Sequence, residues 1–500
     1  MADASHTAEL LDARVLRACG RDVPACFQLA LPAAMRGIGS GPLQCEQILR
    51  CLPGRRLVFL ARASDGRQMV AKVHLYRAAR AMRAERLGLT CLRDAGLAAP
   101  ALLAEAPLEF DAGIQLMEFI AHAQTLAVRW PAATAAQRGQ YFATLAAGFA
   151  RMHAAGARHM DPHLGNFLLA QQVHAIDGGA VRTGVRALPP AQRLRALAQL
   201  HGQCAPQDDL LVDATLASYR AAGGSVLQRS ALLAEIDRVR AKHVRAVLRK
   251  TLRDCSEFHV QRTPRVLVVC RRDALASMQG LLADPDKSIA AGVLLKAGNT
   301  ATVARVAELS AGSRIVKRYN IKSVWHGLTR LFRYSRAERT WLAAHRLALL
   351  GIRTARPIAM RLETIGPLRG RAYLWMEDVP GATLAQRLQT GASPGPGPGP
   401  GIDACLRERV AQVIVRLHDA GLLHGDLKAS NILVGTSEVV LVDLDALVAL
   451  PAGARRDQRQ VRERERFLEN FVSDVERDAW REALLHARAR AQSHSVERAG

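Results

Sequence analysis

The sequence lacks several features that would each assign it to a class of protein. Its nine cysteines are an odd number, scattered from Cys19 to Cys405 without a C-x-x-C pair, so neither a disulfide framework nor a zinc site is expected. No run approaches about eighteen consecutive apolar residues, so no membrane-spanning helix is expected. The first residues include early acids and no long apolar core, unlike a secretory signal. These absences predict a protein of the reducing cytosol, with at most peripheral contact to the cytoplasmic face of a membrane.

Acidic residues are few relative to basic ones. The 500 residues include 45 Asp and Glu against 69 Lys and Arg, a formal net charge of +24. Such an excess predicts an anionic partner, which is a nucleic acid, a membrane surface or a phosphorylated substrate. An Ala- and Arg-rich composition supplies part of the charge by itself. Because no nucleic-acid-binding motif accompanies it, no nucleic-acid partner is expected.

One polar loop in the second half carries a recognisable chemistry. Residues 423–434 are LHGDLKASNILV, with His424, Asp426 and Asn431 in the order H-x-D-x-x-x-x-N, and Asp443 follows twelve residues after Asn431 in VVLVDLD. In kinase-type phosphoryl transfer the first Asp reaches the acceptor hydroxyl, while the Asn and second Asp converge on Mg²⁺ beside the ATP phosphates. Such hard oxygen ligands suit Mg²⁺. The loop therefore predicts ATP and Mg²⁺ as cofactors. The His is expected to brace the loop.

A weaker copy of this pattern lies in the first half. Residues 159–169 are HMDPHLGNFLL, with Asp161 and Asn166 at the same spacing, and Asp177 follows eleven residues after Asn166 in VHAIDGG. Two such loops, each followed by an apolar strand that ends in Asp, predict a duplicated domain.

A strand lysine precedes the first of these loops. Short apolar runs with turn signals over residues 44–74 predict three antiparallel strands, the third of which carries Lys72. Glu85 lies thirteen residues later in a helical stretch. A strand Lys held by a helix Glu is aimed at the α- and β-phosphates of ATP. The alternative is a surface Lys and a helix Glu that do not meet.

The second half repeats this arrangement. Runs at 265–273, 292–309 and 313–320 predict strands, and the last carries Lys317. The loop KAGNTAT contains Gly298, and in a kinase its backbone N–H groups would cover the phosphates, although one glycine falls short of G-x-G-x-x-G. Glu338, twenty-one residues after Lys317, is the expected partner of that lysine.

The predicted fold class is α+β, with two protein-kinase-like bilobal domains in tandem. Each would have an antiparallel β N-lobe and a mainly helical C-lobe with a short tail. The expected limits are an N-terminal arm (1–40), a divergent first domain (41–228), a basic helical connector (229–256) and a second domain (257–500). The connector is equally compatible with the last helix of the first domain. Residues 393–401, SPGPGPGPG, predict an exposed loop because alternating Pro and Gly form neither helix nor core strand.

A basic stretch with interleaved aromatic residues covers positions 322–341. This composition suits an anionic lipid surface or a phosphorylated saccharide. The alternative is a helix whose aromatic residues face the N-lobe core while its arginines are solvated.

Taken together, residues 290–450 resemble the lipopolysaccharide kinase family, the Kdo/WaaP and InaA group of protein-kinase-like enzymes. The matching segments are KRYN around Lys317, SRAERTW, HRLALLGIRTARPIAM, LHGDLKASNILV and VVLVDLDAL. The first half is similar to a more divergent member over about residues 45–225.

This resemblance implies a role for each residue of the pattern. In the second half Asp426 would be the catalytic base, Asn431 and Asp443 would hold Mg²⁺, Lys317 would hold phosphate and Glu338 would hold Lys317. The residues with the same implied roles in the first half are Asp161, Asn166, Asp177, Lys72 and Glu85.

The sequence departs from the protein-kinase pattern in both halves. Asp177-Gly178-Gly179 and Asp443-Leu444-Asp445 replace D-F-G, and no A-P-E follows. In the second half the room for an activation segment is missing, which disfavours a kinase that docks peptides. His163 stands where the second half has Lys428, which disfavours activity in the first half.

The expected function is therefore an ATP-dependent phosphotransferase acting on a sugar hydroxyl of the lipopolysaccharide inner core, or on another anionic saccharide. One alternative is a protein Ser/Thr or Tyr kinase. Another is a pseudokinase scaffold for envelope assembly, especially in the first half.

Overall fold

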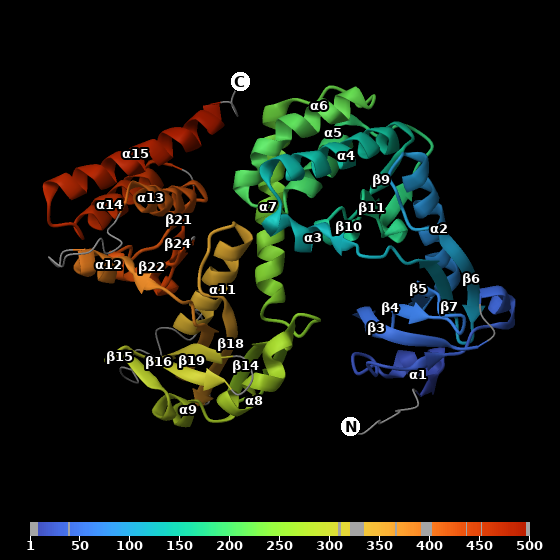
Figure 1. Cartoon of the computed structure of the whole chain (residues 1–500), viewed down its shortest axis with the longest axis horizontal. Coiled ribbons are helices and arrows are strands. Elements are labelled where there is room, and N and C mark those ends of the chain that lie inside the picture. The colour runs from blue at the N-terminus through green and yellow to red at the C-terminus, as the bar shows by residue number, and fades with distance from the viewer. Residues whose placement is uncertain are drawn as a thin grey trace. The chain divides into compact units, whose positions relative to one another are not determined.

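The structure is a computed structural model that describes residues 9–38, 41–308, 312–320, 335–365, 368–391, 403–436, 438–451 and 453–496. The chain divides into two compact units, Met1–Gln203 with Asp209–Val239, and Cys204–Asp208 with Arg240–Gly500. The division falls inside helix α7, Arg229–Lys250. In the described part of the chain each unit holds a seven-stranded sheet and a group of helices (Figure 1).

The sheet of the first unit has the strand order β1-β2-β3-β4-β5-β7-β6. Its strands are β1 (Leu10–Leu11), β2 (Gln28–Leu29), β3 (Leu43–Leu52), β4 (Arg56–Arg62), β5 (Gln68–His74), β6 (Leu102–Leu108) and β7 (Ala112–Glu118). The three strands predicted over 44–74 are confirmed as the antiparallel set β3, β4 and β5. Helix α2, Ala78–Asp94, packs on β7.

The N-terminal residues differ from the prediction of a separate arm. β1 pairs in parallel with β2, which pairs with β3, so this segment extends the sheet. Phe27 packs edge to face on Phe59, with ring centroids 5.1 Å apart, and Leu16 is buried in the same core. The strands of this segment are only two residues long, Leu10–Leu11 and Gln28–Leu29, which is too short for a periodic run to mark them.

The helical part of the first unit follows β7. Its helices are α3 (Leu126–Arg129), α4 (Ala135–Ala154), α5 (Pro190–His201) and α6 (Val212–Ala221). Short strands β8 (Gln124–Thr125), β9 (Ala157–His159), β10 (Phe167–Leu169), β11 (Val173–Ala175) and β12 (Val181–Thr183) form two small sheets. Asp161 lies in the loop between β9 and β10, and Asp177 follows β11. Because β10 and β11 form an antiparallel hairpin, the end of β11 lies beside the start of β10.

The sheet of the second unit has the order β13-β14-β18-β19-β17-β16-β15. Its strands are β13 (Phe258–Arg262), β14 (Val266–Arg271), β15 (Val293–Ala297), β16 (Ala301–Glu308), β17 (Gly312–Tyr319), β18 (Pro357–Ile365) and β19 (Leu368–Glu377). Both faces are buried: Tyr373 and Trp375 of β19 lie in one core cluster and Leu374 in another. Successive residues of a strand point to opposite faces, so β19 contributes to both.

Helices cover this sheet on both sides. α8 (Leu275–Ala283) and α9 (Pro285–Ala291), which the sequence analysis does not predict, belong to the cluster of Tyr373 and Trp375. α11, Arg336–Leu349, packs on β18 and β19 from the other face. Its Trp341 is fully buried there. The rest of the basic and aromatic stretch, up to residue 334, lies outside the described residues, as does the loop 393–401.

The helical part of the second unit consists of α12 (Leu384–Gly391), α13 (Ala404–Asp419), α14 (Ala454–Leu468) and α15 (Asp474–Val496). Phe467, Phe471 and Trp480 form an aromatic cluster in its core. Short strands β20 (Ala382–Thr383), β21 (Leu422–Leu423), β22 (Ile432–Val434), β23 (Val439–Leu441) and β24 (Val448–Ala449) hold the loops between the helices (Figure 1). Among the described residues, no helix is both long and apolar enough to cross a membrane.

Candidate active site

The loop between β21 and β22 of the second unit brings Asp426, Lys428 and Asn431 together. Asn431 Nδ2 donates to the Asp426 backbone oxygen at 2.8 Å and to its Oδ2 at 3.0 Å. Lys428 Nζ lies 2.8 Å from the same Oδ2. Partial burial alone would raise the pKa of Asp426, but the hydrogen bond and charge of Lys428 hold it below its ordinary value. Asp426 is therefore ionised at neutral pH, and Asn431 Oδ1 remains as an oxygen ligand.

Two buried side chains hold this loop. His424 Nε2 donates to the Val442 carbonyl at 3.0 Å, and burial lowers the pKa of this His. Glu463 of α14 accepts the backbone N–H groups of His424 and Gly425 at 3.2 and 2.6 Å and lies 2.8 Å from His418 Nε2. Gly425 has φ +82°, and a Cβ there would lie 2.4 Å from the Ala446 carbonyl, so only glycine fits.

Asp443 has an uncommon backbone conformation. Its φ of 61° and ψ of 56° lie in the left-handed region, which Asp tolerates better than most residues. Backbone strain of this kind concentrates at functional sites, where the surrounding structure maintains it. Here the conformation places Asp443 Oδ1 2.6 Å from Lys317 Nζ.

Lys317 of β17 is held by two carboxylates. Asp445 Oδ2 lies 2.9 Å from its Nζ, opposite Asp443. Asp445 also accepts from Tyr319 Oη and Thr340 Oγ1, both at 2.8 Å, and pairs with Arg336 at 2.7 Å. Burial alone would raise the pKa of Asp445, but the charge and hydrogen bond of Lys317 lower it.

Glu338 does not take the position expected for it. It closes a capping box at the start of α11, where its Oε2 accepts from the Ser335 N–H at 2.7 Å and its own N–H donates to Ser335 Oγ at 3.0 Å. Arg336 and Thr340 are four residues apart and share the helix face that meets Asp445. Glu338 lies about 200° around the helix from Arg336, so it points away from Lys317.

These residues meet in one cleft of about 480 Å³ in the second unit. Lys317 and Gly298 line it from the sheet, and Lys428, Asn431 and Asp443 line it from the loops. Gly298 lies in the turn between β15 and β16, where its N–H donates to the Ala301 carbonyl at 3.1 Å. A carboxylate and an amide oxygen on one wall fit Mg²⁺, which keeps several waters and takes few protein ligands.

The first unit also brings its lysine and glutamate together, but the pair is buried and both oxygens of the glutamate carboxylate accept hydrogen bonds. Lys72 Nζ lies 2.6 Å from Glu85 Oε1, and both residues are buried. The Glu85 carboxylate also accepts the backbone N–H groups of Gly178 and Gly179 at 3.1 and 3.0 Å. A Cβ at Gly88 would lie 1.9 Å from the Gly178 carbonyl, so α2 approaches this turn as closely as glycine allows.

The loop residues of the first unit are arranged differently from those of the second. Asn166 Nδ2 donates to the Asp161 backbone oxygen at 2.9 Å, as in the second unit. His163 Nε2 lies 3.7 Å from Asp161 Oδ2 in place of a lysine. Asp177 has φ −121° rather than a left-handed conformation, and its Oδ1 lies 4.0 Å from Arg56 Nη1. A permanent cation thus stands beside the carboxylate that was expected to bind metal.

His159 braces this loop, since its Nδ1 accepts from the Asp161 N–H at 3.2 Å. Burial lowers the pKa of His159 to about 4, so the ring is neutral at physiological pH. Its position matches the bracing role expected for the histidine of the pattern.

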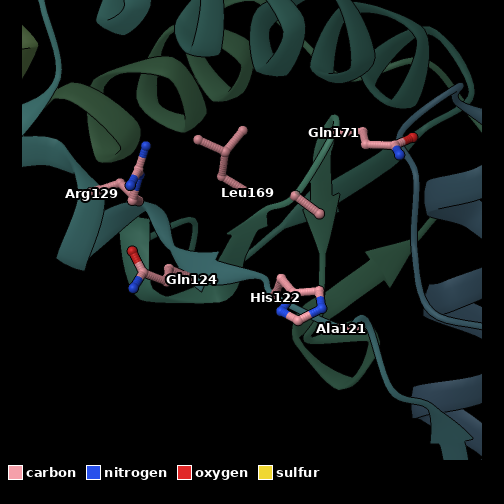
Figure 2. A pocket seen from close by; sticks show the side chains of 7 residues that line it. Ala121, His122, Gln124, Arg129, Leu169 and Gln171 are labelled. Atoms are coloured by element: carbon pink, nitrogen blue, oxygen red, sulfur yellow. The ribbon is translucent and has the colours of Figure 1, made fainter.

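A separate hollow of about 470 Å³ lies in the first unit (Figure 2). It is lined by Ala121, His122, Gln124, Arg129, Leu169, Ala170 and Gln171. None of the site residues predicted for the first unit is among them.

Two residues that hold the second site were not predicted. Asp445 was visible only as part of D-L-D in place of D-F-G, and Glu463 lies in a run of charged residues with no local signal. Their partners come from β17, α11 and the loop between β21 and β22, which are distant in sequence.

A strand lysine, a loop Asn and an Asp after the next strand line one cleft, and the loop Asp426 is hydrogen-bonded to that Asn. Together they define a protein-kinase-like phosphotransferase. Residues 295–487 match the family model described as the lipopolysaccharide kinase (Kdo/WaaP) family. The matched residues lie in the second unit, in agreement with the resemblance of residues 290–450 to this family, and the description of the family is that of a kinase, which is a phosphotransferase.

One similar solved structure is described as WaaP in complex with acyl carrier protein. It is 23% identical to this chain, the match covers 39% of this chain and 87% of that one, and the TM-score is 0.31. No curated protein matches the chain.

Proposed function

We propose that the second unit transfers the γ-phosphoryl group of ATP to a sugar hydroxyl of the lipopolysaccharide inner core. The observation that carries this proposal is the single cleft that gathers Lys317, Asn431 and Asp443. The match of residues 295–487 to the model of the lipopolysaccharide kinase family supports a saccharide acceptor.

The roles follow from the contacts. The acceptor hydroxyl oxygen would form a bond to the γ-phosphorus as the bond from that phosphorus to the β-phosphate oxygen breaks, and ADP leaves. Asp426, which is ionised, would accept the hydroxyl proton. Lys317 would hold phosphate oxygens. Asn431 and Asp443 would hold Mg²⁺, which neutralises phosphate charge when bound.

The test is the phosphate content of the core in cells. Lipopolysaccharide core from cells with the wild-type protein, Asp426→Asn or Asp161→Asn would be compared by ³¹P NMR and mass analysis. We expect Asp426→Asn to remove a core phosphate. An unchanged core in both variants would contradict the saccharide acceptor and favour a protein substrate or a scaffold.

We also propose that the first unit is a second kinase-like domain, within the limits 41–228, and that residues 257–500 form the other. The Lys72–Glu85 pair and the Asn166–Asp161 hydrogen bond support this tandem arrangement. His163, in place of the lysine that lies beside the loop Asp of the second unit, favours a non-catalytic partner. An unchanged core with Asp161→Asn, alongside a loss with Asp426→Asn, would support that assignment.

The proposed place of action is the cytoplasmic face of the inner membrane, with peripheral attachment. Its test is fractionation of cells that make the full chain, with a salt wash of the membrane fraction. Release by salt is expected, because screening weakens contacts between a basic surface and anionic lipids.

A further inference from the structure

Helix α14 carries a row of arginines on its exposed side. Arg455, Arg459, Arg462 and Arg466 are all exposed to solvent. They are spaced by four, three and four residues, so they share one face of the helix. The row extends over roughly 16 Å along the helix axis. We refer to these four residues as the arginine row.

The positive charge of the arginine row is not neutralised locally. In the part of the chain that the structure describes, none of the four has a carboxylate within ion-pairing distance. Of the acidic residues of α14, Asp457 lies 3.6 Å from Arg456, and Glu463 is buried under the catalytic loop. Glu465 forms no ion pair with the row. Four adjacent guanidinium groups without partners favour binding of an anion with several charges.

The row borders the edge of α14 that holds the catalytic loop. Glu463, which binds the N–H groups of His424 and Gly425, lies about 70° around the helix from the centre of the row. Beyond the end of the helix, Asn470 Oδ1 accepts from the Ala429 N–H of the same loop at 3.2 Å. Arg464, which lies about 170° around the helix from the row, contacts His418 of α13 at 3.2 Å.

We propose that the arginine row binds phosphate groups of the saccharide acceptor while a hydroxyl of the same molecule reaches Asp426. This inference rests on the function proposed above. Guanidinium groups bind phosphate with two parallel hydrogen bonds, so they orient the ligand as well as attract it. One phosphate contacts only neighbouring arginines, so a row of this length suits a saccharide with several anionic groups. Asp426 is itself accessible, with 46% of its side chain exposed.

The test uses the full chain with Arg459→Ala and Arg462→Ala together. The matched control is Arg481→Ala with Arg488→Ala, two exposed arginines of α15, which packs on α13. The acceptor is deacylated lipopolysaccharide, which retains its phosphates but forms no membrane, used before and after phosphatase treatment. The readouts are KM for acceptor, KM for ATP, kcat, and binding of the untreated acceptor by calorimetry.

We expect Arg459→Ala with Arg462→Ala to raise the KM for the phosphorylated acceptor about tenfold and to leave the KM for ATP within about twofold of wild type. For the control variant, both KM values should stay within about twofold of wild type. With the phosphatase-treated acceptor, wild type and variant should become alike. An unchanged KM, or an equal loss with both acceptors, would overturn the proposal.

Two further outcomes separate this proposal from others. Weaker binding to anionic phospholipid vesicles with an unchanged acceptor KM would overturn it in favour of a membrane contact. If wild-type protein transfers no phosphate to the saccharide, the proposed function fails. Calorimetry then tests binding at the arginine row independently of transfer. Weaker binding of the phosphorylated acceptor to the variant than to wild type would support the row as its binding surface, and equal binding would overturn it.

Discussion

Asp445 Oδ2 lies 2.9 Å from Lys317 Nζ. The carboxylate that holds this lysine was expected from Glu338 of α11, and Asp445, in the turn after β23, supplies it instead. Tyr319, Thr340 and Arg336 hold Asp445 in place. The lysine is thus held between Asp443 and Asp445 on the same turn, so the positions of Lys317 and of the carboxylate proposed to bind Mg²⁺ depend on one short segment. Asp445 acts through Lys317, which makes it a positioning residue.

Asp445→Asn should lower kcat/KM for ATP by about 10- to 100-fold, because Lys317 loses one of its two carboxylates and Arg336 loses its partner. Glu338→Gln is the control, since Gln also closes a capping box. It should retain near wild-type kinetics. A loss with Glu338→Gln and none with Asp445→Asn would show that Glu338, and not Asp445, positions the lysine.

Asp426→Asn should reduce the rate of phosphoryl transfer by roughly 10²–10⁴, because the amide cannot accept the hydroxyl proton. The KM for ATP should change little, since Lys317 and Asp443 remain. Single-turnover transfer measures the step directly. A rate within a few-fold of wild type would assign proton acceptance to another group.

Gly425→Ala should destabilise the second unit by about 1–3 kcal/mol, because a non-glycine residue is strained in the left-handed region. The clash with the Ala446 carbonyl at 2.4 Å adds to this cost. Thermal unfolding of the full chain measures the loss. Gly312→Ala is a useful comparison, since its φ is +87° and no atom lies within 4 Å of the added Cβ. It isolates the backbone strain from the clash.

Lys72→Met should destabilise the first unit by about 3–5 kcal/mol, because it leaves the buried Glu85 carboxylate without its cation. Adding Glu85→Gln removes that uncompensated charge and keeps an acceptor for a backbone N–H of the Gly178–Gly179 turn. The double variant should therefore recover part of the loss. If the single and double variants unfold at the same temperature, the uncompensated Glu85 carboxylate is not the cause of the loss.

Stability should fall in acid partly through Glu463. Burial alone would raise the pKa of Glu463, but hydrogen bonds from His418 and the loop N–H groups lower it below 4.5. A lowered folded-state pKa means that its stabilisation is complete above pH 4.5 and is lost as pH falls through the folded value. Glu463→Gln should therefore lower Tm at pH 7 and flatten its decline below pH 4.5. A parallel decline in wild type and variant would contradict this assignment.

Local spacing predicted much of the second site because its main parts are close in sequence. Asp426 and Asn431 lie on one loop, and Asp443 follows on the next strand, so a hairpin alone brings them together. The antiparallel strands around Lys72 followed from apolar alternation and turn residues. In the N-terminal segment such alternation is absent, and its strands form only because β3 is available as a partner.

The sequence by itself determined which chemical groups are present and in which order they occur, and this was enough to indicate the family and its phosphotransferase class. The tertiary structure decided which carboxylate holds each lysine. Glu85 meets Lys72 because α2 approaches the glycine turn closely, whereas Glu338 is turned away by the rotation of α11, and Asp445 takes its place. Such choices depend on helix rotation and on contacts between residues that are far apart in the sequence, and short-range patterns contain no information on either.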